Sequence, residues 1–306
     1  MSARSRPRGA ATGIDAAAVE RFQRVRQLSE TLSEPLQVED FVLQAAPQAS
    51  PTKWHLAHVS WFYETFLLEP FLPGYRAYRP GYRYLFNSYY DQVSGGYFPR
   101  HQRGLLSRPT VAEVFAYRAH IDHHMARLLA DPGEHAAVVA LRLNIGINHE
   151  QQHQELLLTD IKYNLSVNPL NPAYRDDLPT PPAGLQSASS SEAGWSRFEG
   201  GLVDIGHHGE GFGFDNEWPR HRQFLPPYQL ANRLVSNADY LQFIEAGGYG
   251  DSSHWLSDGW AAVQQHGWQA PLYWRQQDGE WWTLSLGGLR PVQPTEPVLH
   301  ISYYEA

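Results

Sequence analysis

The residues best suited to metal chemistry lie in the stretch NHEQQHQE, which covers residues 148–155. His149 and His153 are four positions apart. Residues at that spacing stack on one face of a helix, so both imidazoles can bind one metal ion. Two nitrogen ligands leave such a site incomplete, and the third must come from another helix. His55 and His58, in the stretch KWHLAH, are the candidates, and the spacing does not choose between them.

The same stretch also matches H-E-x-x-H, the pattern of zinc peptidases in which the glutamate activates a metal-bound water. Such peptidases need a third protein ligand, often a later glutamate or a third histidine soon after the motif. The next glutamate after Glu155 is Glu192, beyond a proline-rich segment, and the extension H-x-x-G-x-x-H is absent. A zinc peptidase with Glu150 as its base is therefore the minor alternative.

Four further polar residues could take part in the same site. Glu155 follows His153 by two positions, which turns its side chain toward another face of a regular helix. We expect Glu155 to hold a ligand histidine by a hydrogen bond, and not to bind the metal directly. His120, His123 and His124 compete as metal ligands, but we favour them less because histidines also cluster on surfaces without a metal.

Composition limits the class of protein. The chain has 306 residues, of which 42% are hydrophobic and 18% charged, as is typical of a globular protein of about two domains. Its net charge of -8 argues against a general nucleic-acid binder, and no apolar run is long enough to span a membrane. The absence of cysteine excludes disulfides, thiolate metal sites and a cysteine nucleophile. We expect a soluble, cytoplasmic protein without a secretory signal, because no apolar run follows the arginines in MSARSRPRG.

The first half of the chain has the apolar periodicity of helices. Ser50 as a cap with Pro51 in the first turn predicts one helix start, and Thr110 with Glu113 forms the pattern of a capping box at another. Four amphipathic helices joined by one long aromatic connection, residues 69–109, predict a helical bundle. The expected helices cover residues 15–33, 50–68, 110–131 and 134–165.

The second half of the chain has a different sequence pattern. Short apolar runs alternate with glycine and tryptophan after Trp195, which predicts short strands and many loops, with one helix near residues 236–246. The final PVLHISYYEA has the pattern of a strand followed by the start of a helix, and we expect the C-terminal part of this domain to be missing. The predicted organisation is a disordered tail (1–14), a helical bundle (15–167), a Pro/Ser-rich linker (168–194) and a partial domain (195–306).

The motifs together resemble a known family over nearly the whole chain. KWHLAHVSWFYETFLL, NSYY, RHQRGLLSRPT and NHEQQHQELLLTDIKYNLSVNPLNPAY are similar to the ergothioneine-biosynthesis sulfoxide synthases, or hercynine oxygenases. The first part is similar to DinB-like four-helix bundles. The second part, with GGLVDIG, FGFDNEWPRH and FLPPYQLANRLVSNADYLQFIEAGGY, is similar to the formylglycine-generating enzyme or sulfatase-modifying factor, an irregular α+β fold of C-type-lectin kind.

The resemblance implies a specific activity. Such enzymes are mononuclear non-haem iron(II) oxidoreductases that use O₂ to join a thiol sulfur to the imidazole of hercynine, and the product is a sulfoxide. The implied substrates are hercynine, O₂ and either cysteine or γ-glutamylcysteine, with no nucleic-acid or membrane partner. An ovothiol-type enzyme, which uses histidine in place of hercynine, is the close alternative. Family members continue past HISYYEA, so we expect an incomplete substrate pocket and doubtful activity for this chain.

The resemblance also implies the ligands of the iron. The family motif places the first ligand at the second histidine of W-x-L-A-H, which is His58, and the others at His149 and His153. His55 then becomes a neighbour and not a ligand. Three imidazoles leave coordination positions open for thiolate and O₂, as this chemistry requires.

Five further site residues follow from the resemblance. Gln152 matches a glutamine that binds hercynine, and Arg100 with Arg103 match arginines that bind the carboxylate of the thiol substrate. A guanidinium suits that role because its fork binds a carboxylate at two places. Tyr90, ahead of Tyr89, matches the catalytic tyrosine of one subgroup, where a phenol near the iron donates a proton or hydrogen atom.

Overall fold

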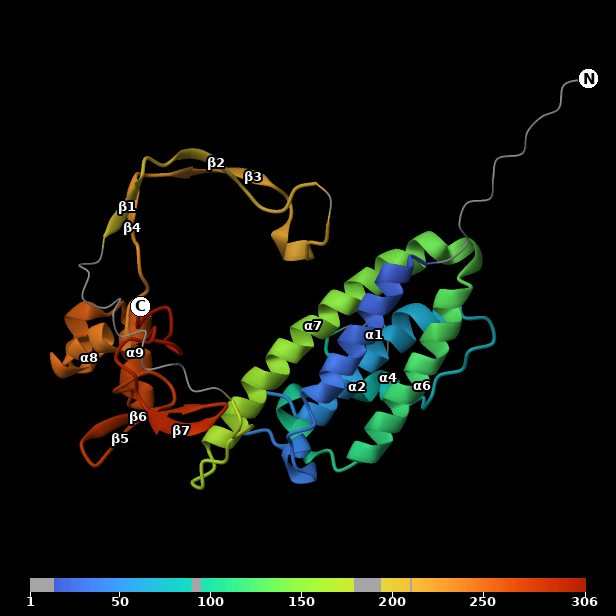
Figure 1. The fold of residues 1–306 in the computed structure, drawn as a ribbon, viewed down its shortest axis with the longest axis horizontal. Coiled ribbons are helices and arrows are strands. Elements are labelled where there is room, and N and C mark those ends of the chain that lie inside the picture. Colours follow the sequence, from blue (N-terminus) through green and yellow to red (C-terminus); the bar gives the residue numbers. More distant parts are fainter. Residues whose placement is uncertain (1–13, 90–94, 179–193, 210) are drawn as a thin grey trace, which may run out of the picture. The chain divides into compact units, whose positions relative to one another are not determined.

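The chain forms two compact units, Met1–Leu170 and Asn171–Ala306. The computed structural model describes residues 14–89, 95–178, 194–209 and 211–306. Long helices build the first unit, and short helices with three small antiparallel sheets build the second (Figure 1). This order confirms the predicted class, a helical bundle followed by an irregular α+β domain.

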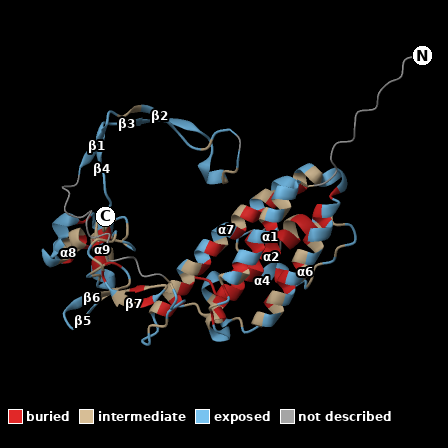
Figure 2. Cartoon of the chain, in the orientation of Figure 1, coloured by how far each residue is buried: buried red, intermediate tan, exposed pale blue. Residues whose placement is uncertain are grey.

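The first unit is a bundle in which α2 packs against α6 and α7, and α1 packs against α7 (Figure 1). Every residue of α2 is buried, which makes it the central helix (Figure 2). Within the described ranges, none of the helices combines the length and the apolar character that a membrane crossing requires. The four main helices are α1 (Ala16–Thr31), α2 (Thr52–Tyr63), α6 (Val111–Ala130) and α7 (Ala136–Ser166).

The starts of two helices test the predicted caps. The capping box of α6 is confirmed, because the Thr110 hydroxyl accepts from the backbone N–H of Glu113 at 3.2 Å and Glu113 accepts from the backbone N–H of Thr110 at 2.8 Å. The predicted serine cap of α2 is wrong. Pro51 is its N-cap residue, and the Ser50 hydroxyl instead accepts a hydrogen bond from buried Arg103 at 2.9 Å.

We expect Thr110→Ala to lower the free energy of unfolding of the helical unit by about 1 kcal/mol, because the first turn of α6 loses a side-chain acceptor. Thr159→Ala is the matched control, since Thr159 is exposed within α7 and its hydroxyl only donates to the carbonyl of Glu155. The control should stay within about 0.5 kcal/mol of the parent in urea denaturation. Equal losses in both variants would contradict a capping role.

The helix expected over residues 50–68 is interrupted. The α-helix ends at Tyr63, a π-helical turn covers Glu64–Leu68, and the short helix α3 (Glu69–Phe71) follows. The turn carries Glu64, which is 3% exposed and accepts hydrogen bonds from the hydroxyls of Tyr75 and Tyr117, both at 2.5 Å. Glu64 thereby ties the long connection to α6. That connection contains α4 (Tyr82–Leu85) and a 3₁₀ segment, Arg100–Leu105.

The second unit is built from antiparallel pairs. β1 (Trp195–Phe198) pairs with β4 (Tyr228–Ala231), and β2 (Gly201–Ile205) pairs with β3 (His221–Leu225). β6 (Glu280–Ser285) lies between the other two strands of the third sheet, β5 and β7. Their bounds, with those of the two longer helices, are Trp274–Gln277 for β5, Gly288–Pro291 for β7, Asn237–Glu245 for α8 and Ser257–His266 for α9.

The core of the second unit gathers around α8 and α9. Tyr240 of the predicted helix packs with Tyr249, Trp255 and Val263. Tyr174 lies near the start of the segment predicted as a linker. Its backbone N–H donates to the carbonyl of Leu286 at 2.9 Å, so Tyr174 packs within the second unit. The predicted final strand is wrong, because Pro297 forms only an isolated bridge with Ser236. The predicted helix start is present as one capped turn, in which Ser302 and Glu305 exchange side-chain hydrogen bonds to each other's backbone N–H and the N–H of Ala306 donates to the carbonyl of Ser302 at 3.2 Å.

Candidate metal centre

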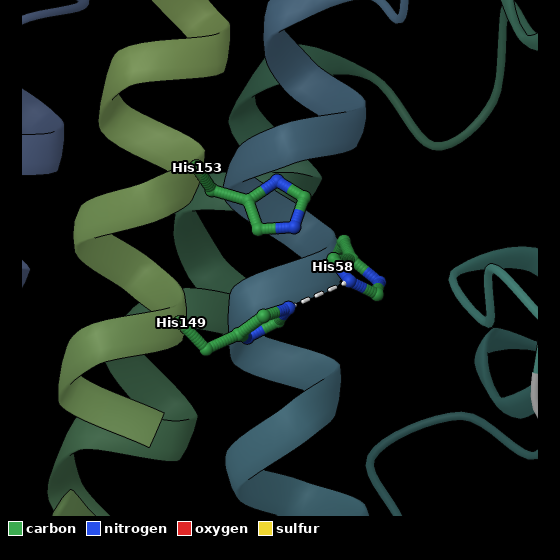
Figure 3. Close-up of side chains that lie close together, drawn as sticks. All are labelled: His58, His149 and His153. Atoms are coloured by element: carbon green, nitrogen blue, oxygen red, sulfur yellow. Dashed lines mark hydrogen bonds between the residues drawn. The ribbon is translucent and has the colours of Figure 1, made fainter. Parts of the chain in front are cut away.

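Three histidines converge in the helical unit. His58 comes from α2, and His149 and His153 come from successive turns of α7 (Figure 3). One ring nitrogen from each lies within 4.8 Å of the others. The centroids of the three rings are 4.6–5.0 Å apart. Three imidazole nitrogens on two packed helices form a ligand set that one metal ion can bridge.

Aromatic packing holds His58 in place. Its ring stacks on Trp54, with centroids 4.6 Å apart and an interplanar angle of 11°, and lies 5.4 Å from the ring of Trp61 at 16°. Both tryptophans are on α2, at positions four before and three after His58, so they lie on the same face of the helix. The imidazole is therefore fixed between two indoles before any metal binds.

Hydrogen bonds identify which nitrogens remain for a metal. Nδ1 of His58 lies 2.6 Å from the carbonyl oxygen of Phe86, and a carbonyl only accepts, so this nitrogen carries the proton. Nε2 of His58 lies 3.2 Å from Nε2 of His149. Nδ1 of His149 is buried and has no hydrogen-bond partner among the described residues. A cation between the two Nε2 atoms would use lone pairs that the protein leaves facing each other.

The three imidazoles are neutral at pH 7. Burial is the main cause that lowers the pKa of His149, to about 4. Burial, followed by the neighbouring histidines, also lowers the pKa of His58 and of His153 well below the usual value. Neutral imidazoles keep a free lone pair, so the donor set fits a transition metal such as iron or zinc. The nitrogen donors alone do not select between them.

His55 lies beside this cluster and outside it. Its Nδ1 is 2.9 Å from Nδ1 of His153, and its Nε2 is 3.0 Å from Oδ2 of Asp160. The packing of α2 on α7 therefore places His58 in the cluster and His55 beside it, which the spacing in the sequence could not decide. Sequence reasoning missed Asp160, although it follows His153 by seven positions, two helical turns on the same face of α7.

The role predicted for Glu155 is corrected. Its side chain is exposed on α7, and among the described residues the hydrogen-bond partner of His153 is His55. The two-position offset from His153 points Glu155 away from the bundle core. The competing histidines His120 and His124 lie together on α6, with ring centroids 4.2 Å apart, but the described residues include no three-ligand group there.

Glu150 is not placed to act as a base. It is 1% exposed and lies in a buried ion cluster, with Oε2 bound to Arg26 at 3.1 Å and Oε1 bound to Arg118 at 3.2 Å and to the Ser29 hydroxyl at 2.7 Å. Burial alone raises the pKa of Glu150, but the two arginines outweigh it, so the pKa lies below its usual value. The peptidase alternative loses its base, because both carboxylate oxygens already have partners.

The two predicted substrate arginines differ in their surroundings. Arg103 is 1% exposed, its guanidinium lies 3.3 Å from the ring centroid of Trp54, and its Nε is buried with no partner among the described residues. Burial lowers the pKa of Arg103 to about 9. Arg100 is exposed. The structure thus places only Arg103 against the aromatic ring that packs on His58.

The remaining predicted site residues are exposed or lie outside the described part of the chain. Gln152 is exposed on α7, one position before His153. Tyr89 is 65% exposed at the end of the NSYY stretch that the structure describes. Tyr90 lies outside the described residues.

Comparisons with known proteins match both units of the chain. Residues 21–157 match the DinB superfamily, and residues 183–306 match the sulfatase-modifying factor enzyme 1-like domain. Three curated relatives with the name hercynine oxygenase also match. The resemblance to the hercynine oxygenases is confirmed.

The relatives come from three mycobacteria. The protein of Mycolicibacterium thermoresistibile is 28% identical over 96% of this chain, that of Mycolicibacterium smegmatis 29% over 86%, and that of Mycobacterium tuberculosis 28% over 86%. The matches cover 63%, 58% and 58% of these relatives. The chain therefore spans less than two thirds of the length of the curated relatives that it matches.

Proposed function

We propose that the chain is the iron-binding part of a hercynine oxygenase. In this proposal His58, His149 and His153 bind iron(II), and the enzyme uses O₂ to join the thiol of cysteine or γ-glutamylcysteine to the imidazole of hercynine as a sulfoxide. The observation that carries the proposal is the convergence of three histidines in the part of the chain that matches the DinB superfamily. The order of the two domains and the names of the relatives support it.

The protein would hold the metal and keep its ligands neutral. Ferrous iron, when bound by three imidazoles, supplies the redox chemistry that activates O₂ and keeps positions open for substrate. The burial of His58 and His149 keeps their lone pairs unprotonated near neutral pH. Phe86 and the flanking tryptophans keep His58 in one orientation.

Other residues of the chain would act on the substrates. Arg103 makes no direct ion pair with a carboxylate among the described residues, and the charge of Asp160 offsets the burial of its guanidinium only in part. A buried guanidinium of this kind favours binding an anion. The carboxylate of the thiol substrate has the required charge, and Arg100 would assist from the exposed side. We assign Gln152 to hercynine, and Tyr90, ahead of Tyr89, to donation of a proton or hydrogen atom.

Anaerobic loading with iron(II), followed by hercynine, a thiol and O₂, tests the proposal. We expect O₂ uptake and a product with the mass of the coupled sulfoxide, in parallel reactions with cysteine and γ-glutamylcysteine. Histidine in place of hercynine distinguishes the ovothiol-type alternative. A chain that binds iron but yields no product, even when extended to the length of its relatives, would contradict the assigned reaction.

A further inference from the structure

We propose that Asp160 and His55 form a hydrogen-bonded relay that fixes the orientation and proton position of His153 and so presents its Nε2 to the metal. This inference rests on the proposed iron site. Both residues are positioning residues, since neither belongs to the three histidines that converge. Asp160 comes from α7 and His55 from α2, so the relay joins the two helices that carry the ligands.

Three contacts build the relay. The backbone N–H of Ser50 donates to Oδ2 of Asp160 at 2.8 Å. The same oxygen lies 3.0 Å from Nε2 of His55. Nδ1 of His55 lies 2.9 Å from Nδ1 of His153. The relay therefore runs without a break from the backbone at the start of α2 to the ring of a metal ligand.

The acceptor at one end sets the direction of each hydrogen bond. A carboxylate oxygen only accepts, so His55 carries its proton on Nε2. A neutral His55 then offers a lone pair at Nδ1, and Nδ1 of His153 must donate to it. The other nitrogen of His153, Nε2, keeps its lone pair for a metal. If His55 donated to His153 instead, a neutral His153 would carry its proton on Nε2, the nitrogen that must bind the metal.

Burial protects the hydrogen bonds of the relay from water. The side chain of His55 is 4% exposed and that of Asp160 is 18% exposed, so water competes little for these hydrogen bonds. His58 is held in the same way, because its Nδ1 donates to the carbonyl of Phe86. His58 and His153 thus each donate from Nδ1 to an acceptor outside the proposed metal site. Such outer partners orient a ligand histidine and raise its basicity.

The decisive comparison replaces two carboxylates on the same helix by amides. Asp160→Asn removes the charge of the acceptor. Its amide oxygen can still accept from the N–H of Ser50 and from Nε2 of His55, so the relay keeps its direction but polarises His153 less. We expect Asp160→Asn to weaken iron(II) binding by about 10–100-fold and to shift the visible absorption bands of the Co(II)-substituted protein. Glu155→Gln is the control, since Glu155 is exposed and does not contact His153. Its affinity and spectrum should match those of the parent. Anaerobic competition with a chromophoric chelator measures the affinity.

A pair of His55 variants separates hydrogen bonding from packing. His55→Gln keeps an acceptor and a donor, whereas His55→Phe fills the space without either. A relay predicts tighter iron(II) binding in His55→Gln than in His55→Phe. If Asp160→Asn does not fold, the order of these two affinities tests the relay in its place. Parent-like binding and spectrum in Asp160→Asn, or equal binding in the two His55 variants, would overturn the relay alone. A parent chain that binds neither iron(II) nor cobalt(II) would overturn the iron site itself.

Discussion

His149→Ala is expected to abolish tight binding of iron(II). The substitution leaves two of the three converging imidazoles, and nothing on α7 replaces the lost nitrogen, since the described residues hold no other three-ligand group. Loss of a direct ligand should exceed the roughly 10–100-fold that loss of an outer partner costs. Metal content after anaerobic loading, together with chelator competition, measures the effect, and O₂-dependent product formation should disappear with the metal.

His123→Ala provides the matched control for that experiment. His123 is an exposed histidine on α6 and lies outside the converging group. The variant should keep parental iron affinity, and circular dichroism should show equal helix content in both variants. Iron binding that survives in His149→Ala and fails in His123→Ala would move the site to α6 and contradict the proposed centre.

Glu150→Gln is expected to destabilise the helical unit strongly. The substitution removes the buried carboxylate that Arg26 and Arg118, which are 3% and 0% exposed, share. The carboxylates that remain beside them, Asp122 and Glu30, are more exposed to water. Breaking a buried ion pair by removing one partner costs about 3–5 kcal/mol. For a unit of this size the midpoint of thermal unfolding should fall by roughly 6–20 °C. Differential scanning calorimetry of the metal-free protein measures it, so that metal binding does not contribute.

The same substitution at Glu155 isolates the effect of burial. Glu155→Gln removes a carboxylate from the same helix at an exposed position, and its unfolding midpoint should match that of the parent. The pair also separates two chemistries. A zinc peptidase would lose peptide cleavage in Glu150→Gln while its fold stayed intact. A stable Glu150→Gln protein would contradict the structural role assigned to this carboxylate.

Local patterns in the sequence determined much of this protein. The apolar periodicity predicted the four main helices, and the spacing of Thr110 and Glu113 predicted the cap of α6, because both depend on residues within one or two turns. The four-residue spacing of His149 and His153 placed two of the converging imidazoles on one face for the same reason.

Only the tertiary structure decided what depends on contacts between distant segments. His55 and His58 are equivalent by spacing, and the packing of α2 on α7 brings His58 into the cluster and leaves His55 beside it. Glu150 fits a peptidase motif, yet arginines from α1 and α6 enclose it. Side chains far apart in the chain exert their charge and hydrogen bonds only after the helices pack, and no local spacing records which partners they meet.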